Sequence, residues 1–139
     1  MNNYLIGIAV VLLLITFPIQ QAVEKYNNHK AIIVMKAVDY TIEVAVREGY
    51  FTDANQSDLV NRLTGAFADL DTADVEFVSV TETPRYKTEL YDETELVEWT
   101  IRVRINNVFA VPALSGITAE NNNYYLYFVG KMPSERLAN

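Results

Sequence analysis

Apolar side chains fill almost every position from Tyr4 to Phe17, and no charged residue occurs before Glu24. Extended to Val23, a helix that rises 1.5 Å per residue is roughly 30 Å long, which is enough to cross the hydrocarbon core of a bilayer. A backbone in lipid must satisfy its own hydrogen bonds. The pattern therefore predicts a membrane-spanning helix at the start of the chain.

The helical pattern continues beyond this apolar stretch. Between Pro18 and Glu48 there is no other proline and no glycine, and apolar residues recur near helical spacing with charged residues between them. Gly49 follows as a C-cap residue. We predict one helix of about 45 residues, apolar all round in its first half, amphipathic in its second, and kinked near Pro18. The amphipathic half has the apolar positions Val23, Tyr26, Ile33, Ala37, Val38 and Ala45, and the polar positions Lys25, Lys30, Lys36, Asp39, Glu43 and Arg47.

Part of this stretch also fits a strand. Residues 32–35 are rich in β-branched side chains, and over 42–47 the β-branched residues Ile42, Val44 and Val46 alternate with Glu43, Ala45 and Arg47. A helix is preferred because no turn signal separates these residues from the preceding ones.

The rest of the chain predicts a second helix and a small sheet. Asp53 and Gln56 form a capping-box pattern, and a helix is expected from there to about Asp69. Its apolar side has Leu59, Val60, Leu63, Ala66, Phe67 and Leu70. Period-two alternation predicts one strand that begins at Val75 and ends before Thr83, and another over Leu96–Ile105. Further strands are expected at Val108–Val111 and Tyr124–Val129, with a polar loop or hairpin tip at 85–95. The expected fold class is α+β, a long helix and a short one packed on about four antiparallel strands.

A length of 139 residues suits one domain, and the composition of the chain argues against several classes of function. The net charge of −7 disfavours nucleic acid as a partner, because phosphate binding requires clustered Lys and Arg. There is no cysteine, and the single histidine, His29, lies in a charged stretch where an exposed helix residue is expected. No catalytic or nucleotide-binding motif occurs. We therefore expect neither an enzyme nor a bound cofactor or metal.

Three further features admit two interpretations each. The acidic residues of 69–76 and of 92–95 are candidates for calcium binding, but the EF-hand spacing, glycine and late glutamate are missing, so solvated acidic turns are expected. Asn55 begins an N-glycosylation triplet, which also arises by chance at the start of a helix. The tyrosines of 124–127 suit an intersubunit surface and equally suit packing within a strand.

A spike-like N-terminal helix with a proline in its membrane half, followed by a small antiparallel sheet, resembles the type IV pilin superfamily. The stretch Arg47-Glu-Gly-Tyr-Phe-Thr, followed by a helix ending in Leu63-Thr-Gly-Ala-Phe, is similar to pilin-like proteins of the tight-adherence class. These pilins usually carry Glu near the start of the mature chain, where Leu5 stands here. Because of that departure, the chain resembles a minor pilin, a pseudopilin or a divergent filament subunit more than a standard major pilin.

The resemblance implies a structural subunit of an extracellular, pilus-like helical filament. Residues 1–23 would span the inner or cytoplasmic membrane before assembly and form the filament core afterwards, while residues 24–139 form an outward-facing head at the cell surface. Its partners would be copies of itself or similar pilin subunits. Gly7 and Ala9 would permit close approach of neighbouring helices. The assembly residues are Tyr4, Leu5, Ile6, Gly7, Ile8, Ala9, Val10, Val11, Leu12, Leu13, Leu14, Ile15, Phe17 and Pro18.

Other interpretations of the N-terminal segment stay open. A cleaved signal peptide needs a basic start and a small-x-small cleavage site, whereas residues 1–3 have no Lys or Arg and residues 20–22 make a poor site. A plain single-pass anchor is the stronger alternative. The protein would then be a non-polymerising accessory component of a secretion or conjugation apparatus, or a tethered extracellular binding domain.

Overall fold

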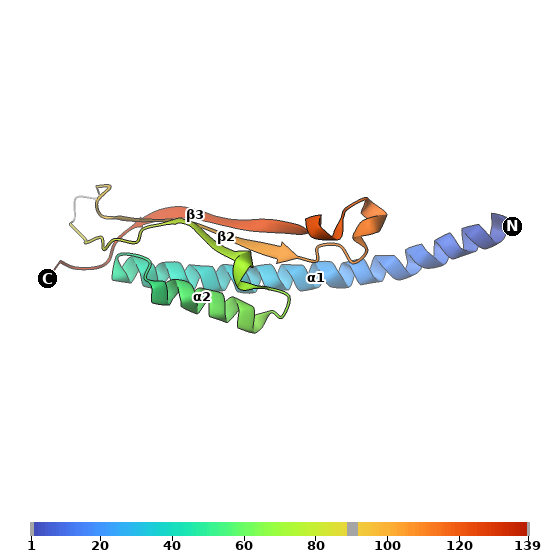
Figure 1. Ribbon diagram of the computed structural model, residues 1–139, viewed down its shortest axis with the longest axis horizontal. Helices are drawn as coiled ribbons and strands as arrows, with labels where there is room; N and C mark the ends of the chain where they lie inside the picture. Colours follow the sequence, from blue (N-terminus) through green and yellow to red (C-terminus); the bar gives the residue numbers. More distant parts are fainter. Residues whose placement is uncertain (1, 89–91, 139) are drawn as a thin grey trace.

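The computed structural model describes residues 2–88 and 92–138 of the chain. The expected α+β class is confirmed, with two helices followed by a three-stranded antiparallel sheet (Figure 1). The elements are α1 (Asn2–Glu48), α2 (Asp53–Ala66), β1 (Val75–Val80), β2 (Leu96–Asn106) and β3 (Asn123–Pro133), with short 3-10 turns at Thr72–Asp74, Pro112–Ser115 and Ala119–Asn121.

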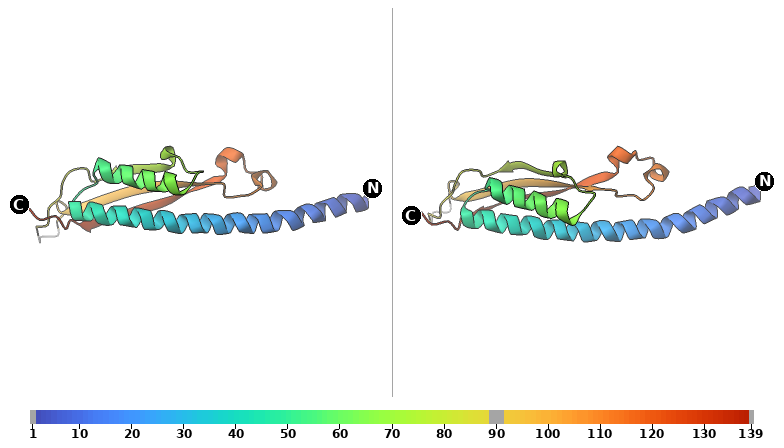
Figure 2. Two further views of the ribbon diagram at one scale, coloured as in Figure 1. Left: turned by 90° about the horizontal axis from the view of Figure 1, so that it is seen from below. Right: turned by 60° about the horizontal axis from the view of Figure 1, so that its bottom comes forward.

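The long helix α1 is continuous over its 47 residues, so the single-helix prediction is confirmed and the alternative strand is wrong. Pro18 lies inside the helix, and the N-terminal part of α1 bends away from the line of the rest (Figure 2). The helix ends at Glu48, and Gly49 follows it as expected, with a φ of 84°. A Cβ at this position would lie 2.2 Å from the carbonyl oxygen of Arg85, so only glycine fits the turn.

The second helix is capped by Thr52, and the expected cap at Asp53 is wrong. The Thr52 hydroxyl accepts a hydrogen bond from the backbone N–H of Asn55 at 3.1 Å. Thr52 has the extended backbone that an N-cap requires, whereas Asp53 is already helical. The helix ends at Ala66, before the expected end near Asp69, because Phe67 turns to an extended conformation.

The sheet has the order β1-β2-β3, and the expected fourth strand at Val108–Val111 is wrong. That segment lies in the loop between β2 and β3. The Asn122 side chain occupies the hydrogen-bonding groups of Phe109: its Oδ1 accepts from the backbone N–H at 2.8 Å and its Nδ2 donates to the carbonyl at 2.9 Å. The last strand is longer than expected, since β3 continues to Pro133 along the full length of β2.

Both helices cover the same face of the sheet (Figures 1 and 2). The alternation expected for β2 is confirmed, because its odd-numbered residues point toward the helices. Burying each aliphatic side chain of this core contributes roughly 1.5–3 kcal/mol. The core comprises Val34, Val38, Ile42, Ala45 and Val46 of α1, Leu59 and Leu63 of α2, and Val97, Ile101, Val103 and Ile105 of β2, together with Phe51, Phe67, Leu70 and Val75.

The segment after β3 closes the far end of α1. The backbone N–H of Glu135 donates to the carbonyl of Val46 at 2.9 Å, and the guanidinium of Arg136 donates to the carbonyl of Glu48 at 3.2 Å. These carbonyls belong to the last turn of α1, where no intrahelical donor is present. The C-terminal segment thereby ties the end of β3 to the end of α1.

Gly49→Ala is expected to lower the free energy of unfolding by about 2 kcal/mol or more, since this backbone conformation alone costs an L-residue roughly 1–2 kcal/mol. Gly65→Ala is the matched control, because nothing lies within 4 Å of a Cβ at Gly65 in α2. It should be neutral or stabilising by up to about 1 kcal/mol. Urea unfolding of the full chain in mild detergent, followed by circular dichroism, measures both. Equal stabilities would contradict the role of Gly49.

Candidate functional site

The first part of α1 projects from the head with no other element beside it (Figure 1). Its large apolar side chains have exposed fractions from 46% at Ile19 to 82% at Tyr4. The most apolar window of 18 residues has a mean hydropathy of 2.2, and none of it is buried. By length and composition, this helix can cross a membrane. An exposed apolar surface of this extent marks an interaction site.

The assembly residues of the sequence prediction, from Tyr4 to Phe17 and including Pro18, all lie on this uncovered part and are all exposed. They surround the helix rather than forming one stripe, because consecutive positions along it are apolar. Nothing lies within 4 Å of a Cβ built at Gly7, so the surface there is open. The structure therefore places the predicted residues together, as one cylinder of apolar side chains.

Contacts between the head and α1 begin at Gln20, where the loop between β2 and β3 reaches the helix. The Gln20 side chain accepts a hydrogen bond from the backbone N–H of Ala110 at 3.0 Å and donates one to the carbonyl of Val108 at 3.3 Å. Further along α1, the buried Asn27 donates to the carbonyl of Asn107 at 3.1 Å. These contacts hold the loop beside α1 at the point where the helix leaves the head (Figure 1).

Lys30 is buried, so the prediction that it lies on the polar side of α1 is wrong. Its side chain is 1% exposed, and its Nζ lies 2.6 Å from Oδ2 of Asp69, whose side chain is 28% exposed. The ammonium also lies 5.2 Å from the ring centroid of Tyr26 and 5.4 Å from that of Phe67, within the range of cation–π attraction. The pair joins α1 to the segment that follows α2.

The charge of Lys30 changes the acidity of Asp69. Partial burial of this carboxyl group favours its neutral form and raises its pKa. The hydrogen bond from Lys30 and the positive charge beside it outweigh burial, so the pKa of Asp69 lies below its ordinary value of 3.8. Asp69 is therefore ionised at neutral pH, where its ion pair with Lys30 stabilises the folded head.

Among the other acidic residues of 69–76, Asp71 and Glu76 are exposed, as expected, whereas Asp74 is not. Asp74 is buried and accepts hydrogen bonds from the backbone N–H of Asp71 at 2.9 Å and from the side chain of Asn106 at 3.1 Å. Glu76 pairs with Arg102 across the sheet at 2.5 Å. Within 2–88 and 92–138, no three His, Cys, Asp or Glu residues converge as a metal site.

The second acidic cluster, 92–95, is also less solvated than expected. Glu95 is buried and accepts a hydrogen bond from the Thr88 hydroxyl at 3.0 Å, so its prediction as a solvated residue is wrong. Asp92 is exposed and accepts from the backbone N–H of Thr94 at 3.0 Å. The loop or hairpin tip expected at 85–95 falls partly on residues 89–91, which lie outside the described residues. Its described parts are non-helical and have a single bridge, between Lys87 and Leu137.

The remaining candidates separate in the structure. His29 is exposed on α1, as expected. Asn55 lies in the first turn of α2, where its side-chain amide donates to Glu48 at 2.7 Å. The tyrosines divide, because Tyr124 packs against the core, whereas Tyr125 and Tyr127 are exposed on the open face of the sheet.

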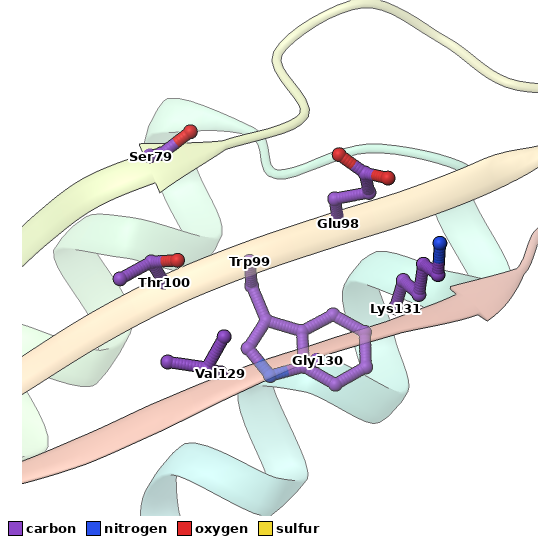
Figure 3. A pocket seen from close by; sticks show the side chains of 7 residues that line it. All are labelled: Ser79, Glu98, Trp99, Thr100, Val129, Gly130 and Lys131. Carbon is purple, nitrogen blue, oxygen red and sulfur yellow. The ribbon is translucent and has the colours of Figure 1, made fainter. Parts of the chain in front are cut away.

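The sheet carries a shallow hollow around Trp99 and Gly130 (Figure 3). Gly130 stands opposite Trp99 in the register, and a Cβ there would lie 2.7 Å from the indole, so glycine leaves room for the ring. Glu98 and Lys131, also directly opposite each other, line the hollow together with Ser79, Thr100 and Val129. A cross-strand charge pair of this kind stabilises a sheet. The hollow contains no imidazole or thiol, and we assign it no catalytic role.

No protein-family model, curated protein or solved structure matches the chain. Function therefore has to be inferred from the molecule itself. Two features are informative, the uncovered apolar surface of α1 and the way in which the head is attached to this helix.

Asp69→Asn is expected to lower the free energy of unfolding at pH 7 by about 3–5 kcal/mol, because it leaves the Lys30 ammonium buried without a counter-charge. The loss should shrink below about pH 4, since the stabilisation by a carboxylate of lowered pKa disappears as the pH falls through the folded pKa. Urea unfolding across this range measures both effects.

Asp58→Asn is the matched control for this change. Asp58 pairs with Arg62 at 2.6 Å on the exposed surface of α2. Exposed pairs contribute about 0–1 kcal/mol, so this variant should remain close to the wild type. A loss at Asp69→Asn that is as small as in the control, or that does not change with pH, would contradict the role of the buried pair.

Proposed function

We propose that this protein is a pilin-type structural subunit that α1 holds in a membrane until it assembles with copies of itself, or with similar subunits, into a helical filament at the cell surface. The observation that carries the proposal is the continuity of α1. One unbroken helix is apolar and uncovered in its first part and forms the core of the head in its second. A tethered binding domain needs only a flexible connection to its anchor, whereas a filament subunit needs a rigid one.

The uncovered part of α1 suits two environments. A helix that is apolar all round is stable in lipid and equally stable at the centre of a bundle of similar helices. Transfer from the membrane to a filament core exchanges one apolar environment for another. Gly7 and Ala9 are small enough to let backbones approach closely within such a bundle. Repeated contact between different surfaces of identical subunits then generates an open helical polymer.

The architecture supports this proposal by its resemblance to type IV pilins, in which a spike-like helix has a small antiparallel sheet packed on its second half. Leu5 departs from the usual acidic residue, which favours a minor or divergent subunit. The competing interpretations are a non-polymerising accessory component and a tethered binding domain. Both use the membrane but leave the first part of α1 in lipid. Burial of this part among copies therefore distinguishes the proposal from its competitors.

Leu13→Lys is expected to abolish the filament. A charge near the middle of the span costs about 2.5–3.5 kcal/mol on insertion and stays unpaired inside a helix bundle. Leu137→Lys is the matched control, because the two leucines are 71% and 70% exposed but lie on α1 and on the C-terminal segment. Electron microscopy of material sheared from the cell surface, with mass spectrometry of its subunits, gives the readout. Wild-type cells without filaments containing this chain, or filaments that persist in Leu13→Lys, would sink the polymer proposal.

Gly7→Leu separates assembly from membrane insertion. A larger apolar side chain is tolerated in lipid and improves helix propensity, but it pushes closely packed helices apart. The variant should reach the membrane in wild-type amounts and yield severalfold fewer filaments. Val11→Leu, which enlarges an exposed side chain on the same part of α1, is the control and should assemble. Unchanged filament yield from Gly7→Leu would show that the helices do not meet at Gly7.

A further inference from the structure

The loop between β2 and β3 has the composition of a membrane-contacting segment. No charged residue occurs from position 105 to 119, although the chain as a whole carries 29 Asp, Glu, Lys and Arg residues among 139. We call residues 108–117 the apolar loop. Its Leu114 is 71% exposed and Val111 is 40% exposed, so the loop presents large apolar side chains outward instead of packing them into the head.

The apolar loop is fixed beside the uncovered part of α1. Its backbone at Val108 and Ala110 is hydrogen-bonded to Gln20, and both views of Figure 2 place it at the end of the head that faces the N-terminus. A span of about 20 residues that begins near Tyr4 ends near Val23, just before the first charge at Glu24. Gln20 then lies within the last turn of the span, at the level of the bilayer surface.

We propose that the apolar loop inserts into the lipid interface next to α1, so that the head rests on the membrane at a second point. Apolar side chains bind this boundary region in proportion to the area they bury there. The loop has no charge to desolvate, and Pro112 has no backbone N–H. Three of its amides donate within the loop, from Leu114 to Val111 at 3.1 Å, from Gly116 to Ala113 at 3.2 Å and from Ile117 to Pro112 at 3.1 Å. Each of these bonds lowers the desolvation cost of placing the loop in lipid.

Lipid is favoured over a second protein as the occupant because the loop continues the apolar surface of α1. Insertion of α1 brings the loop to the interface in every single copy, before any other subunit is present. The contact would fix the orientation of the head and limit the tilt of α1. This inference rests on the membrane stage of the proposed function, and it does not require polymerisation.

The chain has no cysteine, so single-cysteine variants allow labelling with an environment-sensitive fluorophore. The full chain carries Leu114→Cys, Leu137→Cys or Leu13→Cys and is reconstituted in phosphatidylcholine–phosphatidylglycerol vesicles at high lipid excess. Iodide quenches labels in water, and brominated lipids quench labels in the bilayer. We expect iodide quenching at 114 to be severalfold weaker than at 137, and brominated-lipid quenching to occur at 114 and 13 but not at 137.

Each other outcome overturns the inference in a distinguishable way. A label at 114 that iodide reaches as well as at 137, while 13 is quenched by lipid, rejects the loop contact and leaves the membrane stage of the proposed function intact. A label at 13 that lipid does not reach rejects both. Protection at 114 that disappears as the protein is diluted in lipid assigns the loop to a second copy. Leu114→Ser, labelled at Ala113→Cys, provides a second check, since loss of the leucine should restore iodide access.

Discussion

The structure depends on one constraint: the single helix α1 is packed inside the head along its second part and uncovered along its first part. The second part of α1 is covered by α2 and the sheet, while its first part has no intramolecular cover. Because the backbone hydrogen bonds run through both parts, the head cannot turn about the axis of α1 without turning the uncovered first part of the helix. Pro18 removes one of those bonds near the boundary between the two parts. The bend there changes the direction of the first part of α1 without breaking the helix.

The head is held to α1 by polar contacts at its two ends and by apolar packing between them. At the end near the uncovered part of α1, loops are bound by the side chains of Gln20, Asn27 and Lys30. At the other end, the C-terminal segment is bound by the carbonyls of Val46 and Glu48. Between these ends the core is aliphatic and non-directional. Directional contacts at both ends fix where the head sits along α1, which packing alone specifies less strictly. A rigid spacing of this kind is what a repeating assembly requires.

Sequence periodicity predicted both helices, the three strands of the sheet and the apolar first part of α1, because these features follow from local patterns. The burial of Lys30 could not be predicted, since its partner Asp69 and the ring of Phe67 are far away in the sequence. Val108–Val111 has the composition of a strand, but Asn122 and Gln20 take up its hydrogen bonds. Thr52 displaced Asp53 as the cap because backbone conformation decides between two suitable side chains. The errors at Lys30 and at Val108–Val111 concern contacts between segments that the sequence separates, whereas the error in the cap is local.

If the chain assembles as proposed, the uncovered first part of α1 also determines which interactions control that assembly. Leaving a large apolar side chain in water costs roughly 1.5–3 kcal/mol, so the exposed residues from Tyr4 to Ile19 together make a water-exposed state of α1 very unfavourable. Lipid and a bundle of like helices both remove this cost, and to a similar extent. In the proposed assembly, the balance between membrane and filament would therefore not be decided by hydrophobicity. It would be decided by terms that differ between the two states, which are the close packing that Gly7 and Ala9 permit, contacts between heads, and any lipid contact of the apolar loop that is lost when a subunit leaves the membrane.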